Sequence, residues 1–217
     1  MALTLNSVSL AVIEYLRKHI ITGQLHPGQK LNEVELSSLL NISRGPLREA
    51  FRVLEAENLL FTIPRKGTFV SEMSQDDFTE VLETRSMLEL WAINLIRDRK
   101  ITNLEKIASS IKEIDKHPMP DEGATPEEKL EYLLCFAEFH KQIVISAENR
   151  RLEQFYERFS SSLLRYQYNY FYKSLDQTKF KLEHEEILTA MEAGDYGEAK
   201  RLLRDHIHIG FELNKIV

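Results

Sequence analysis

Residues 43–54 read Ser-Arg-Gly-Pro-Leu-Arg-Glu-Ala-Phe-Arg-Val-Leu, a pattern that predicts a helix with one cationic and one apolar face. Arg44, Arg48 and Arg52 recur every fourth residue and share one side, while apolar residues fill the other. Such a helix suits insertion into the major groove of DNA, with its first turns nearest the bases. The alternative is a solvent-exposed surface helix that carries three arginines.

A shorter amphipathic helix and a tight polar turn precede this stretch, which is the order of a helix-turn-helix motif. Asn32 can cap the shorter helix, with Glu35 reaching back in a capping box. Ser43 can cap the arginine-rich helix, and Pro46 falls in its first turn, where a missing N–H costs little. Upstream, another apolar-periodic helix is predicted to end near Gly23.

Two short β-prone runs, residues 60–63 and 68–70, follow the arginine-rich helix. The turn between them, Pro64-Arg65-Lys66-Gly67, carries two cations and a glycine that can adopt a positive φ. This pattern predicts a two-stranded wing whose tip meets phosphate or a minor groove.

Three segments carry a family resemblance: residues 21–31 (Ile-Thr-Gly-Gln-Leu-His-Pro-Gly-Gln-Lys-Leu), 43–50, and 64–70 (Pro-Arg-Lys-Gly-Thr-Phe-Val). Together, over about residues 8–73, they resemble the DNA-binding domain of the GntR family of bacterial transcription regulators. The resemblance implies that Arg44 and Arg48 contact operator DNA. Val34 stands where some members carry an arginine, so we expect no contact there. The expected DNA-binding residues are Ser43, Arg44, Gly45, Pro46, Arg48, Arg52, Arg65, Lys66 and Gly67.

Composition fits an intracellular regulator with two domains. We place a DNA-binding domain at residues 1–74 and an effector and dimerisation domain at 75–217. Residues 1–74 hold 8 Lys and Arg against 7 Asp and Glu, whereas residues 75–217 hold 20 against 27, so the acidic excess lies in the second domain. The affinity for DNA should therefore be modest and salt-sensitive. The lone Cys135, and the lack of a long apolar run or signal-peptide pattern, favour the cytoplasm and no membrane partner.

The second domain is expected to be all helical, which makes the fold mainly α. Apolar periodicity, caps and breakers predict six helices and no further strand after Val70. Thr125-Pro-Glu-Glu is the clearest start signal, with a cap and a proline at the first helical position. The predicted helices span about 74–99, 102–116, 125–146, 149–173, 176–193 and 195 onward.

His140, His184 and His206 each lie on a different predicted helix, so their rings can converge in the bundle centre. Neutral imidazoles are good ligands for divalent ions such as zinc or nickel. The alternative for each is a surface or hydrogen-bonded core histidine.

Several motifs carry a second resemblance: Arg85-Ser-Met-Leu-Glu89, Phe139-His140-x-x-Ile143, Asn149-Arg-Arg-Leu152, the stretch from His184 to Asp195, and His206-Ile207. Residues of about 77–214 resemble the FadR C-terminal domain (FCD), the all-helical effector module of one GntR subfamily, in its shorter six-helix branch. The resemblance implies a metal held by three histidines and one aspartate, and His140, His184 and His206 match the histidines. Phe136 occupies the aspartate position, so one ligand is missing.

Three interpretations of the histidines follow. Metal and histidines can together bind a small organic acid that shifts the two DNA-reading domains of a dimer. The site can instead have lost its metal, with Phe136 lining a pocket for a more apolar ligand. A histidine-liganded hydrolase is disfavoured, because no helix carries a His-Glu-x-x-His pair. We therefore predict no enzymatic activity.

Arg85 is the first expected effector contact, because a cation on an apolar helix side needs an anionic partner. The alternative is an internal salt bridge with Glu89, four residues on. Tyr166, Asn169 and Tyr170 belong to an unusually aromatic stretch that can line a pocket, or can serve helix packing or a dimer contact.

One recognition helix reads too few bases for useful specificity, which predicts a homodimer on a palindromic operator. The function expected from the sequence is a ligand-responsive transcription regulator, more specifically a repressor. The alternative is a metal-sensing or constitutive DNA-binding protein whose second domain only dimerises.

Overall fold

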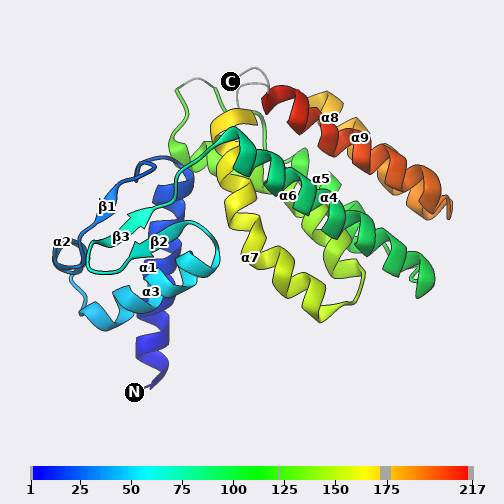
Figure 1. Cartoon of the computed structure of the whole chain (residues 1–217). Helices are drawn as coiled ribbons and strands as arrows, with labels where there is room; N and C mark the ends of the chain where they lie inside the picture. Colours follow the sequence, from blue (N-terminus) through cyan, green and yellow to red (C-terminus); the bar gives the residue numbers. More distant parts are fainter. Residues whose placement is uncertain (1, 122, 172–176, 215–217) are drawn as a thin grey trace.

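The structure is a computed structural model that describes residues 2–121, 123–171 and 177–214. Its amino-terminal part packs three helices against a small sheet, and its carboxy-terminal part is a helical bundle (Figure 1). The mainly α fold predicted from the sequence is confirmed. The amino-terminal elements are α1 (Ala2–Ile21), β1 (Lys30–Leu31), α2 (Glu33–Leu39), α3 (Arg44–Ala56), β2 (Leu60–Ile63) and β3 (Gly67–Val70).

The apolar side of α3 forms the core of the amino-terminal part. Leu47, Ala50 and Leu54 are fully buried there, together with Leu16 and Ile20 of α1. Burying each leucine or isoleucine contributes about 1.5–3 kcal/mol, so this contact fixes α3 against α1. The opposite, cationic side of α3 is left facing solvent.

The two predicted caps form differently from the expectation. Asn32 caps α2 by accepting from the backbone N–H of Val34 at 2.9 Å. Glu35 binds the side-chain amide of Asn32 rather than its backbone N–H, so no reciprocal capping box forms. Ser43 occupies the cap position of α3 without a side-chain hydrogen bond. Its hydroxyl is therefore not committed to the helix.

The wing belongs to a three-stranded antiparallel sheet with the order β1-β3-β2, rather than the two-stranded hairpin predicted. The additional strand, β1, pairs Lys30 with Phe69. At the tip, Arg65 adopts a φ of +66° and Gly67 one of +120°. This φ favours glycine, whereas the Lys30 side chain, 2.9 Å from a Cβ placed on Gly67, could shift aside.

The carboxy-terminal bundle is built around α4, which contacts α6, α7 and α9. Thr125 and Glu128 form the reciprocal capping box of α6, in agreement with the start signal. The fourth predicted helix ends as an α-helix at Tyr166 and continues as a π-helix, η1 (Gln167–Phe171). The helices are α4 (Gln75–Asp98), α5 (Glu105–Ile114), α6 (Pro126–Ser146), α7 (Arg150–Tyr166), α8 (Gln177–Glu192) and α9 (Tyr196–Asn214).

The carboxy-terminal end of α1 joins the two parts (Figure 1). Ile21 packs in an apolar cluster with Leu130 and Leu133 of α6 and Leu164 of α7. Lys18 Nζ also lies 3.0 Å from Glu127 Oε1. Within the described ranges, no helix has the length and apolar character needed to cross a membrane.

Candidate DNA-binding surface and histidine centre

The three arginines of α3 project from the exposed face of the helix. Arg48 is 60% exposed at its side chain, and its Nε donates to Glu33 Oε2 at 3.0 Å. Arg52 lies 3.4 Å from Glu49. Exposed ion pairs of this kind are worth about 0–1 kcal/mol, so DNA phosphate or base edges can displace both carboxylates at small cost.

The wing adds exposed cations at Arg65 and Lys66, while Ser43 and Gly45 are exposed at the start of α3. Pro46, which we expected among the DNA contacts, is buried in the core side of α3. Pro46 is therefore not available to DNA. The surface that DNA can reach is formed by the arginines, Ser43, Gly45 and the wing.

Three histidines converge in the effector bundle from α6, α8 and α9. The Nε2 atoms of His140, His184 and His206 lie 3.2 Å apart in each of the three pairs. All three residues are buried. The convergence predicted from the sequence is therefore present.

Two carboxylates bind the outer nitrogens of two of these rings. His140 Nδ1 lies 2.7 Å from Glu89 Oε2, and His206 Nδ1 lies 2.7 Å from Glu183 Oε2. Glu89 Oε1 also accepts from Arg85 Nε and from the Tyr156 hydroxyl, each at 2.9 Å. Carboxylates in this position fix the ring orientation of metal-binding histidines.

Burial favours the neutral form of all three rings. Burial lowers the pKa of His140 and of His184 well below the ordinary value, helped for His140 by the charge of Arg85. Burial also lowers the pKa of His206, against the opposing effect of Glu183. A neutral imidazole carries one N–H and one lone pair. Because Nδ1–H is donated to a carboxylate, the Nε2 atoms of His140 and His206 present lone pairs to each other.

This arrangement fits a divalent metal ion. Two nitrogens bound to one zinc at about 2.1 Å, and separated by ~100–110°, lie about 3.2–3.4 Å apart, which matches the triangle. His184 can donate a proton to one neighbour only, so without a cation the contact between His140 and His206 stays repulsive. A cation at the centre would accept a lone pair from each of the three Nε2 atoms and so remove this repulsion.

Aromatic rings close the other sides of the triangle. Phe139 stacks on His184 with ring centroids 4.0 Å apart, and Phe136 lies 6.1 Å from the same ring. Phe136 is buried in an apolar cluster with Tyr132 and Phe180. The histidine group contains no carboxylate ligand, so its donors are three nitrogens.

The family models agree with this geometry. The model described as "Bacterial regulatory proteins, gntR family" matches residues 8–70, and the "FCD domain" model matches residues 80–208. The chain belongs to the GntR family. It is therefore a DNA-binding transcription regulator with an FCD effector domain, in a family of regulators rather than enzymes.

Individual relatives cover nearly the whole chain. The HTH-type transcriptional repressor GlaR of Escherichia coli is 28% identical over 92% of this chain and 92% of its own length. The HTH-type transcriptional regulator YdhC of Bacillus subtilis is 27% identical over 92% of this chain and 78% of its own length. A GntR regulator structure from Rhodococcus sp. RHA1 has a TM-score of 0.73 at 22% identity, over 95% of this chain and 97% of that one, and so shares the fold.

In this GntR-family chain, the expected effector residues whose side chains the structure describes are not gathered in one cavity. Arg85 makes the predicted alternative, the buried ion pair with Glu89, and also lines a cleft beside α7. Tyr166 stacks on Phe78 at 4.8 Å, and its hydroxyl accepts from the backbone of Ser74 and donates to Asp77. Its side chain thus serves packing, the alternative that we kept open.

Of the remaining two expected residues, Asn169 lies at the domain junction. Asn169 Nδ2 donates to the carbonyls of Ile21 and Arg165. The side chain of Tyr170 lies outside the described residues.

Sequence reasoning missed the residues that support the histidines. Glu89 was noted only as a partner of Arg85, and Tyr156 and Glu183 were not singled out. The signal available for Glu89 was a carboxylate on the apolar side of a helix, four residues after an arginine. No local pattern marked Tyr156, because it meets Glu89 from 67 residues away.

Proposed function

We propose that this GntR-family protein is a ligand-responsive repressor that binds a palindromic operator as a homodimer. The observation that carries the proposal is an exposed cationic face on α3 in the same chain as a buried triangle of histidine nitrogens. The relative GlaR is named a repressor, which supports repression over activation. We assign DNA reading to residues 1–74 and effector binding and dimerisation to residues 75–217.

In this proposal, α3 and the wing make the contacts with the operator. Arg44, Arg48 and Arg52 present guanidinium groups to the major groove, where arginine pairs best with guanine. Arg65 and Lys66 of the wing neutralise phosphate, which positions the protein without reading sequence.

We further propose that the Nε2 atoms of His140, His184 and His206 hold a divalent ion, zinc or nickel. When bound, such an ion would act as a Lewis acid for a carboxylate oxygen of a small organic acid. Glu89 and Glu183 orient the two rings that they contact, and Phe136 supplies apolar bulk where the family carries aspartate. Arg85 remains our proposed contact for the anionic effector.

Dimerisation is supported by an exposed apolar pair on α4. Met87 is 63% exposed and Trp91 is 53% exposed, and they lie one helical turn apart. Exposed tryptophan and methionine are enriched at protein interfaces. We propose that this face of α4 meets its copy about a two-fold axis.

The histidine triangle alone would also support a metal sensor whose second domain only dimerises. The test is selection of duplexes from a pool with a randomised centre, followed by affinity measurement on the selected duplex. Fluorescence anisotropy would compare metal-stripped protein, zinc-loaded protein, and zinc-loaded protein with citrate.

The proposal predicts an enriched inverted repeat and an affinity that changes when citrate is added to the zinc-loaded form. A response to zinc alone would favour the metal sensor. Failure to enrich any sequence would overturn the assignment of a palindromic operator.

A further inference from the structure

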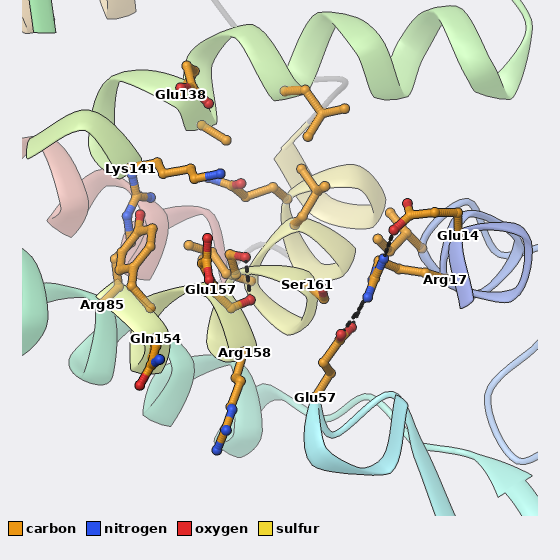
Figure 2. A pocket seen from close by; sticks show the side chains of 18 residues that line it. Glu14, Arg17, Glu57, Arg85, Glu138, Lys141, Gln154, Glu157, Arg158 and Ser161 are labelled. Carbon is orange, nitrogen blue, oxygen red and sulfur yellow. Dashed lines mark hydrogen bonds and ion pairs between the residues drawn. The ribbon is translucent and has the colours of Figure 1, made fainter. Parts of the chain in front are cut away.

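A cleft of about 630 Å³ lies between the DNA-binding domain and the effector bundle. Figure 2 shows Arg17 of α1 and Glu57, which follows α3, toward one end and Arg85 and Lys141 toward the other. Its volume falls within the range of small-molecule sites, about 300–1,000 Å³. The helices α6 and α7 supply most of the lining between these ends.

Two cations, Arg85 and Lys141, lie together on the effector side of the cleft. Arg85 is only 4% exposed, and among the described residues its guanidinium makes one hydrogen bond, from Nε to Glu89. The rest of that group faces the cleft. Lys141 extends along the same cavity, and within the described ranges it makes no ion pair. The remaining N–H groups of Arg85 and the ammonium group of Lys141 can together donate to a carboxylate.

Acidic residues limit what else the ligand can carry. Glu138 and Glu157 also line the cleft, and Figure 2 shows both in the half that holds Arg85 and Lys141. They would repel a ligand that is anionic along its whole length. A monocarboxylate with its charged end at Arg85 and Lys141, and with an uncharged body that extends along the cleft toward Arg17, fits this lining.

The opposite wall belongs to the DNA-binding domain. Arg17 Nε donates to Glu57 Oε2 at 2.8 Å, and its NH2 group lies 2.5 Å from Glu57 Oε1. Glu57 is the residue that caps the end of the recognition helix α3. A ligand in the cleft would therefore lie against the ion pair that ties α1 to α3.

The carboxylate of Glu89 also connects the cleft to the histidine centre by hydrogen bonds. Arg85 and Tyr156, both in the lining, bond Glu89 Oε1, while Glu89 Oε2 accepts from His140. A ligand that draws on Arg85 weakens its bond to Glu89. Binding at the cleft and at the histidines should thus affect each other, and reciprocally.

We propose that this interdomain cleft binds a small organic carboxylate through Arg85 and Lys141, and that the ligand acts on the DNA-binding domain directly at the Arg17–Glu57 pair. The proposal rests on the ligand response proposed above, and adds where the ligand lies and which contact it changes. The histidine centre is then a neighbouring site rather than the whole of the effector site.

The first experiment measures carboxylate binding without metal. Calorimetry would titrate acetate, butyrate, succinate and glutarate into EDTA-stripped protein that carries His206→Ala. We expect at least one to bind, and Lys141→Gln to weaken that binding by about tenfold or more, as loss of a charged hydrogen bond implies. The matched control is Lys112→Gln, on the exposed face of α5. Equal affinity of Lys141→Gln and Lys112→Gln for the acid would contradict the proposal that the cleft binds a carboxylate. Binding of none of the four acids would also contradict it.

The second experiment measures coupling to DNA. In Arg17→Gln we expect the same acid still to bind at Arg85 and Lys141, but to lose its effect on operator affinity. A full DNA response in Arg17→Gln would overturn the route through Glu57. Another outcome is an acid that binds the wild-type protein in a way that requires Lys141 and yet leaves operator affinity unchanged. That result would contradict the proposed ligand-responsive function but would support the cleft as a binding site.

Discussion

Glu89 connects more of the effector domain than any other single side chain described above. It is fully buried, and its two oxygens accept from His140, Arg85 and Tyr156. Burial, together with the charge of Glu89, raises the pKa of the Tyr156 phenol well above its ordinary value, so Tyr156 stays a donor. Orientation of the histidines and charge balance of Arg85 therefore depend on one carboxylate.

Glu89→Gln should destabilise the fold. The amide keeps the shape but leaves the Arg85 guanidinium buried without a counter-charge, which costs about 3–5 kcal/mol. Urea unfolding of the metal-free protein would measure this loss. The control Glu131→Gln, exposed on α6, should change stability by about 0.5 kcal/mol or less. Equal stability of the two variants would show that Arg85 does not need Glu89.

His206 and His208 form a matched pair on α9. The first points into the triangle and is buried, whereas the second is exposed. His206→Ala should abolish near-stoichiometric zinc, because two nitrogens hold the ion poorly, and His208→Ala should retain it. Elemental mass spectrometry of zinc-loaded, desalted protein makes the comparison. Equal zinc in both variants would exclude the triangle as the metal site.

Among single residues, the sequence predicted the candidate metal ligands better than the residues that hold those ligands in place. The three histidines were found because family motifs and helix spacing mark them. Tyr156 and Glu183 were not found, since each reaches the site through tertiary packing that no local spacing encodes. Phe136 was predicted to replace a ligand, and its side chain lies in apolar surroundings beside His184.

Among elements, the wing is the simplest to test. Arg65 and Lys66 are exposed at a tip held by the positive φ of Gly67. Arg65→Ala or Lys66→Ala should weaken binding to the operator and to an unrelated duplex by similar factors. Each should also reduce the slope of log affinity against log salt by about 1. The measurement is a salt series by anisotropy, with Lys112→Ala as control. Loss confined to one operator base would contradict the phosphate role.

The elements that the sequence predicted well are those with strong local signals. Thr125 and Glu128 formed their capping box because cap, proline and glutamate all agree. Strand β1 was missed, since two residues show no periodicity and exist as a strand only by pairing with β3. The π-helix after Tyr166 was also missed, because its hydrogen-bond pattern has no distinct side-chain period.

For the whole molecule, Trp91 tests the dimer. It is the only tryptophan in the sequence and is half exposed on α4 next to Met87. Trp91→Glu should weaken self-association by at least about 30-fold, as expected for an interface residue worth ~2 kcal/mol. Sedimentation equilibrium measures this, with Leu182→Glu on α8 as the matched exposed control. Equal effects of both substitutions would place the interface elsewhere.

The relation between the domains was beyond sequence reasoning. The cleft joins Arg17 and Glu57, which are 40 residues apart, to residues of α4, α6 and α7. Periodicity assigns each of them to a helix, but does not say how two separate cores pack together. Only the structure places the end of α1 against α6 and α7.

The most direct test of the account is the base preference of Arg48→Ala. Affinities would be measured by anisotropy for the selected duplex and for every single-base change in one half-site, with wild type, Arg48→Ala and Lys112→Ala. We predict that Arg48→Ala loses about 1–3 kcal/mol of discrimination at one or two symmetry-related positions, while Lys112→Ala matches wild type. An unchanged base preference in Arg48→Ala would contradict the claim that α3 reads the operator.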